Sequence, residues 1–132
     1  MTKDNIANEF NETFLELLKD IASMAPNTPV GKNIKDIESV FKKLDSKTKY
    51  KFIDNFILKV LKYQDQIESE DESFFFEELL KDEIKNDQSV VDSGINILEL
   101  IPIWKKLKQN DRKSVFAYLR LLCDMCNDYL LL

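Results

Sequence analysis

Only two glycines and three prolines occur in this chain of 132 residues. An all-β fold reverses the chain many times, and its tight turns depend on glycine and proline. So few of these residues favour helices joined by short connections. Hydrophobic residues make up 44% and charged residues 33%, a balance typical of a globular protein with one hydrophobic core. We therefore expect a single all-α domain covering residues 1–132.

Apolar residues recur at spacings of three and four along most of the chain, as they do on the buried side of a helix. Several helix starts are marked by residues that cap free N–H groups: Ser46, Ser69 in a capping box with Glu72, and Asn110 or Asp111. Together these signals predict a bundle of five to six helices. The predicted helices cover residues 5–25, 33–44, 46–67, 69–84, 93–107 and 110–132.

The last predicted helix is apolar over more than half of its circumference. Its polar strip consists only of Arg120, Asp124, Asn127 and Asp128. A helix with so wide an apolar surface is buried on most sides, so we expect it at the centre of the bundle. The helix before it contains Pro102, which removes a backbone hydrogen bond and should kink or break it.

Three consecutive phenylalanines stand in the acidic stretch DESFFFEELL. Successive helical residues are about 100° apart, so Phe75 and Phe76 can share the inward side while Phe74 projects away from it. Phe74 could fill a second intramolecular groove, be singly exposed, or anchor a partner. We favour the third interpretation, in which Phe74 and the terminal residues Leu130, Leu131 and Leu132 bind another protein chain or a second copy.

Most active-site chemistry is missing from the sequence. The chain has no histidine, which removes the commonest general base and most zinc sites. Its two glycines cannot build a phosphate-cradling loop. Cys123 and Cys126 have metal-knuckle spacing but no second ligand pair, so we interpret them as buried hydrophobic residues. Acidic residues near 77–82 are expected on a solvated helix face. We predict no enzyme activity, cofactor, metal or small-molecule substrate.

The net charge of −5 argues against general nucleic-acid binding. Two segments are nevertheless basic, residues 42–51 and 105–113, and we call them the 42–51 corner and the 105–113 corner. If the corners are neighbours in space, they offer an alternative function, the binding of nucleic acid or phosphate. The residues of this alternative site are Lys42, Lys43, Lys47, Lys49, Lys105, Lys106, Lys108, Arg112 and Lys113.

No apolar run approaches the ~20 residues of a membrane span, and the polar start is unlike a signal peptide, so a cytoplasmic location is expected.

Two stretches, FLELLKDIASMAP and IPIWKKLKQNDRKSVFAYLRLL, resemble the opening and closing segments of small helical proteins encoded by large DNA viruses of protists and algae. The resemblance implies a host-cytoplasmic or virion-associated protein and carries over no functional residues. The sequence therefore predicts a non-enzymatic helical module for protein–protein interaction or structural support. Together with the resemblance, it predicts a component of a virion or a replication factory.

Overall fold

The computed structural model of this chain describes residues 2–27, 29–71 and 107–132, and all regular structure in these ranges is helical. The all-α fold class is confirmed. The helices are α1 (Lys3–Met24), α2 (Pro29–Lys32), α3 (Ile34–Lys42), α4 (Lys51–Lys59), the 3₁₀ turn η1 (Leu61–Tyr63), α5 (Gln64–Glu68) and α9 (Gln109–Leu130).

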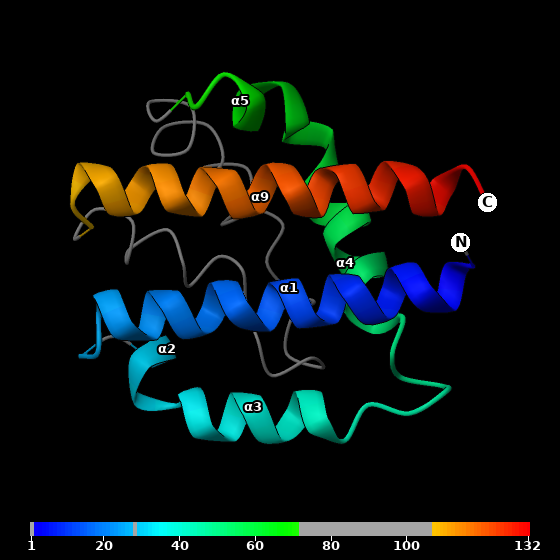
Figure 1. Cartoon of the computed structure of the whole chain (residues 1–132), viewed down its shortest axis with the longest axis horizontal. Coiled ribbons are helices and arrows are strands. Elements are labelled where there is room, and N and C mark those ends of the chain that lie inside the picture. Colours follow the sequence, from blue (N-terminus) through cyan, green and yellow to red (C-terminus); the bar gives the residue numbers. More distant parts are fainter. Residues whose placement is uncertain (1, 28, 72–106) are drawn as a thin grey trace.

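The two longest of these helices, α1 and α9, run antiparallel and side by side (Figure 1). α9 packs against α1, α4 and α5, so the central place predicted for the C-terminal helix is confirmed. α1 also contacts α3, and it therefore lies between α9 and α3 (Figure 1). The buried residues of the two long helices are Ile6, Ala7, Phe10, Asn11, Phe14, Leu17, Leu18 and Ile21 in α1, and Val115, Phe116, Leu119, Leu122, Cys123 and Cys126 in α9.

Five phenylalanine rings join α1, α3 and α4 within this core. The rings of Phe41 and Phe52 stack with their centroids 4.6 Å apart, and Phe14 lies 6.0 Å from each of them. Phe10 meets Phe56 edge to face at 5.4 Å. Aromatic pairs in such geometries stabilise a core beyond the area they bury. The short helix α3 is thus held on α1 and α4 by aromatic contact.

The connection from α1 to α3 is tight. α1 ends at Met24, and Pro29 begins α2. Proline suits the first turn of a helix because it lacks an N–H that would be unpaired there. Gly31 permits the return of the chain, since a Cβ at this position would lie 2.6 Å from the carbonyl oxygen of Ala25.

Two predicted helix starts are wrong. Ser46 does not cap a helix, because α4 begins only at Lys51. The neighbouring Asp45 carboxylate instead accepts hydrogen bonds from the backbone N–H groups of Lys47 (2.9 Å) and Thr48 (3.0 Å), which turns the chain before α4. α9 begins at Gln109, ahead of both residues predicted as its cap.

The predicted helix over residues 46–67 is interrupted. α4 ends at Lys59, and the chain tightens through η1 before α5. α5 then closes with backbone hydrogen bonds from Glu70 to Ile67 (3.2 Å) and from Asp71 to Gln66 (3.0 Å), with Glu70 left-handed at φ 53°. These bonds form a Schellman motif, a helix end that usually has glycine at the left-handed position.

Ser69, predicted to cap the next helix, ends α5, and its hydroxyl donates to the carbonyl oxygen of Gln66 (3.2 Å). Its expected partner Glu72 lies outside the described residues, as do residues 72–84 and 93–106 of the next two predicted helices and the kink expected at Pro102.

Candidate functional site

The C-terminal end of α9 carries leucines that are not covered by the rest of the fold. Leu130, Leu131 and Leu132 are 57%, 85% and 58% exposed. Leu58, in α4, is 68% exposed. We call these four residues the terminal leucine surface. Phe74, predicted to act with the three terminal leucines, lies outside the described residues.

Polar contacts between α9 and the α4–α5 segment bring Leu58 to the same end of the molecule. The Tyr129 hydroxyl donates to Asp54 (3.4 Å), and the Asn127 amide donates to Gln64 (2.9 Å). Leu58 lies between Asp54 and Gln64 in the chain, one helical turn after Asp54. These hydrogen bonds hold the end of α9, which carries the terminal leucines, against the α4–α5 segment.

Tyr129 is the centre of this attachment. Its ring lies 6.3 Å from the ring of Tyr50, and the Lys3 ammonium lies 5.1 Å from its centroid. Burial and then the nearby Asp54 carboxylate raise the pKa of the Tyr129 hydroxyl, so the group stays protonated and able to donate. One side chain thus connects α9 with α1 and with the start of α4.

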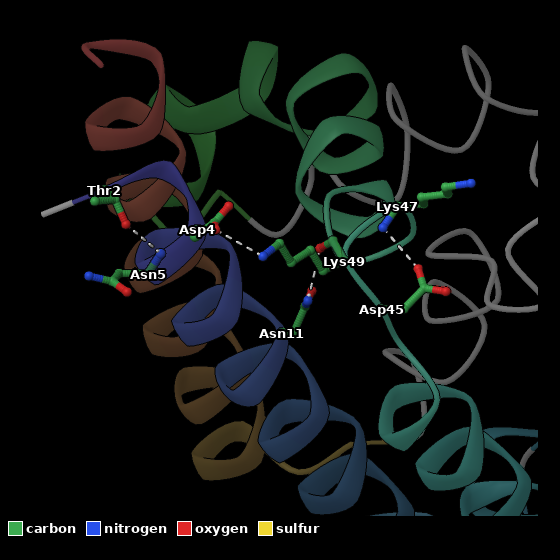
Figure 2. Close-up of polar contacts among 7 residues, drawn as sticks. All are labelled: Thr2, Asp4, Asn5, Asn11, Asp45, Lys47 and Lys49. Atoms are coloured by element: carbon green, nitrogen blue, oxygen red, sulfur yellow. Dashed lines mark hydrogen bonds and ion pairs between the residues drawn. The ribbon is translucent and has the colours of Figure 1, made fainter.

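The 42–51 corner is folded back onto α1 (Figure 2). The Lys49 ammonium is 3.1 Å from the Asp4 carboxylate and 5.4 Å from the centroid of the Tyr50 ring. The Lys49 carbonyl oxygen accepts a hydrogen bond from the Asn11 amide at 2.9 Å. Lys49, one of the residues predicted to bind polyanions, is therefore already paired with an acidic group.

The described parts of the two basic corners do not lie together. The 42–51 corner lies beside the start of α1 and the end of α9, whereas Lys108, Arg112 and Lys113 lie at the start of α9, at the opposite end of the molecule (Figure 1). At 1.5 Å per residue, α9 separates the two ends by about 30 Å. Lys105 and Lys106 lie outside the described residues. A single polyanion site made from both corners is thus not formed by the described residues.

The two cysteines lie on the inward side of α9, and both are buried and free. Burial, followed by the nearby Asp124 carboxylate, raises the pKa of Cys123 to about 12. Burial also raises the pKa of Cys126 well above its usual range. Protonated, buried thiols are poor nucleophiles and poor metal ligands. Within the described residues, no group of three or more His, Cys, Asp or Glu side chains could hold a metal ion.

Sequence reasoning missed two polar residues that organise this core. The Tyr118 hydroxyl donates to Asp20 at 2.7 Å across the α1–α9 contact, and this hydrogen bond raises the pKa of Tyr118 to about 12. Asn11 is only 7% exposed, and its Oδ1 has no hydrogen-bond partner in the described part of the chain. The sequence did carry a sign that Asn11 is buried. It stands four residues after Ala7 and three before Phe14, which places it on the apolar side of α1.

No protein-family model, curated protein sequence or solved structure matches this chain. In the described residues no helix has the length and apolar character needed to cross a bilayer. The resemblance to small viral helical proteins is neither supported nor contradicted by these comparisons.

Proposed function

We propose that this chain is a non-enzymatic helical module that binds another protein chain through the terminal leucine surface. The observation that carries the proposal is the exposure of three successive leucines at the end of α9, together with exposed Leu58 on α4, a helix that packs against α9. Single exposed apolar residues are ordinary on a protein surface, but several gathered at one place are typical of an interaction site.

The free energy gained by burying these leucines limits how strong the contact can be. Complete burial of an exposed leucine side chain contributes about 1.5–3 kcal/mol. Part of that gain offsets the loss of translational and rotational freedom on binding, which costs about 4–15 kcal/mol. Four leucines can therefore supply the centre of a weak interface, and an aromatic anchor such as Phe74 would strengthen it.

On the viral resemblance alone, we place this module in a virion or a replication factory. The acidic net charge of −5 and the ion pair between Lys49 and Asp4 favour a protein partner over a polyanion. The start of α9 keeps exposed lysines, but without the 42–51 corner they form a smaller basic surface than the alternative function requires.

The proposal is tested by site-specific crosslinking in extract of the native source. A photo-reactive side chain is introduced at Leu131 in one variant and at Val40, an exposed apolar position on α3, in a second variant. We expect a discrete adduct from position 131 and none of the same mass from position 40. The triple change of Leu130, Leu131 and Leu132 to serine should prevent capture through a crosslinker at Leu58, while Val40→Ser should not.

The same serine variant must keep the thermal unfolding midpoint of the wild type, because its altered side chains are outside the core. Equal capture from positions 131 and 40, or capture that survives the triple serine change, would contradict a binding role for the terminal leucine surface.

A further inference from the structure

One face of α9 points away from the described helices that pack on it. Lys113, Ala117, Leu121, Asp124 and Asp128 are exposed, and their spacings of four, four, three and four place them in one stripe along the helix. Leu121 is 46% exposed in the middle of this stripe. We call these five residues the outer stripe. It contains none of the four residues of the terminal leucine surface.

The charges of the outer stripe have the order that an isolated helix disfavours. Lys113 stands in the second turn of α9, toward the positive end of the helix dipole, and Asp128 stands in the last turn, where the dipole is negative. Within the described residues, Lys113, Asp124 and Asp128 form no ion pair. The stability of α9 by itself thus gives no reason for this order of charges. A partner whose charges have the opposite order would neutralise the charges of the outer stripe.

The stripe is complementary to itself when reversed. Lys113 lies eight residues before Leu121, and Asp128 lies seven residues after it, which is about 12 Å and about 10.5 Å along the helix axis. If two copies of α9 lie antiparallel with their Leu121 side chains in contact, each Lys113 therefore faces the second copy's Asp128. Ala117 and its small side chain lie next to this centre and allow the two helices to approach closely.

We propose that the outer stripe pairs with the outer stripe of a second copy of this chain, in an antiparallel two-fold dimer centred on Leu121. Two-fold pairs are the commonest form of self-association, and each contact in them occurs twice. A foreign basic segment would match Asp124 and Asp128 but would leave Lys113 facing like charge. A second copy matches both ends, which is why it is the favoured occupant.

The properties of this dimer follow from its size and its charges. One helix stripe buries less than the ~800 Å² per partner of a standard interface, so the dimer should be weak and depend on protein concentration. Exposed ion pairs are screened by salt, so raising the ionic strength should shift the equilibrium toward the monomer. The proposal does not rest on the function of the terminal leucine surface.

Charge reversal tests the register directly. Sedimentation velocity over a concentration series gives the dimer dissociation constant of the wild type and of the exposed variants Lys113→Glu, Asp128→Lys and Leu121→Ser. In a dimer of Lys113→Glu, the new glutamate of one copy faces Asp128 of the second copy at both ends of the contact. In a dimer of Asp128→Lys, the new lysine likewise faces Lys113. We expect the dissociation constant of each variant to rise at least about tenfold. Leu121→Ser should weaken the dimer as well, because it removes the central apolar contact.

An equimolar mixture of Lys113→Glu and Asp128→Lys is the decisive sample. In the mixed dimer both ends join opposite charges again, so dimer should return to within about threefold of the wild-type dissociation constant. The matched controls are Lys35→Glu and Asp36→Lys, at exposed positions on α3, which make the same changes in net charge and should leave the equilibrium unchanged.

Three results would overturn the proposal. The first is a wild type that stays monomeric up to about 1 mM. The second is a dimer that is insensitive to both charge reversals, since it would use another face. The third is loss of dimer in the single variants without recovery in the mixture, since the antiparallel register would then be wrong. Deleting residues 130–132 removes part of the terminal leucine surface and should leave this dimer intact. A failure of the dimer proposal can therefore be distinguished from a failure of the proposed partner site.

Discussion

Asn11 offers a sharp test of how the 42–51 corner is held on α1. Its amide donates to the Lys49 carbonyl oxygen at 2.9 Å, and its side chain is buried (Figure 2). The change Asn11→Asp keeps the size of the side chain but replaces the donor with a carboxylate oxygen. The new group then faces a carbonyl oxygen, and the Lys49 ammonium is already paired with Asp4.

The expected loss of stability has two parts. Losing the hydrogen bond costs about 0.5–1.5 kcal/mol, and more if the Lys49 carbonyl stays buried without a donor. Burial also disfavours the charged form and raises the pKa of the introduced carboxyl above its ordinary ~3.9. Each unit of pKa shift costs about 1.36 kcal/mol at neutral pH, so a shift of about two units adds about 2.7 kcal/mol. The total expected for Asn11→Asp near pH 7 is about 3–4 kcal/mol.

The sign of the pH dependence follows from proton binding. With its pKa raised by folding, the folded variant binds more protons than the unfolded chain between the two pKa values. Stability relative to wild type is therefore best below about pH 4 and is lost as the pH rises toward 7. The protonated carboxyl can also donate to the Lys49 carbonyl oxygen, which restores part of the hydrogen bond at low pH.

Urea denaturation of wild type and Asn11→Asp at about pH 4.5 and about pH 7.5 measures this difference. Asn8→Asp is the matched control, because it makes the same chemical change at an exposed position of the same helix. We expect the control to lose less than about 0.5 kcal/mol at both pH values. Equal losses in the two variants, or a loss for Asn11→Asp that does not grow with pH, would contradict the burial of Asn11 and its hydrogen bond to Lys49.

Three further changes test the core and the helix ends. Leu119→Ala should cost about 2–5 kcal/mol in chemical denaturation, because Leu119 is buried in α9, and a loss under about 0.5 kcal/mol would place it outside the core. The raised pKa values of Cys123 and Cys126 mean that stability should fall as the pH rises above about 8.5, where the unfolded thiols ionise first. Replacing both cysteines with alanine should flatten that dependence, and an unchanged slope would contradict their burial. Glu70→Gly should be more stable than Glu70→Ala by about 1 kcal/mol, since only glycine adopts the left-handed backbone freely and both variants lose the ion pair with Arg120 (3.4 Å). A more stable alanine variant would refute the left-handed conformation.

The long amphipathic helices were predictable because their signal is repeated over many residues. In α1 the apolar residues that recur at spacings of three and four are all buried up to Ile21, and Met24, at the helix end, is half-buried: they are Ile6, Phe10, Phe14, Leu17, Leu18 and Ile21. In α9 the apolar arc likewise predicted the central position. Each additional turn with the same spacing adds evidence for the same buried side, so the all-α class followed from the sequence with few alternatives.

The helix boundaries were predicted less well because one or two residues decide them. Ser46 and Asp45 are adjacent and both can cap a backbone N–H, and the structure uses the Asp45 carboxylate to make a turn instead of a helix start. The apolar spacing from Phe52 to Ile67 is also compatible with one continuous helix. The 3₁₀ turn at Leu61–Tyr63 preserves the buried side while changing the path of the chain, so the spacing alone could not reveal it.

For the candidate site, composition sets the chemistry that this chain can offer: no histidine, few glycines, terminal leucines and two basic corners. The packing of the helices sets which of these groups meet. It placed the described parts of the basic corners at opposite ends, paired Lys49 with Asp4, and left Leu121 on an outer face although its neighbour Leu122 is buried. The physical reason is that side-chain type and helical spacing are local properties. Proximity and exposure depend instead on how whole helices pack, which here is antiparallel for α1 and α9.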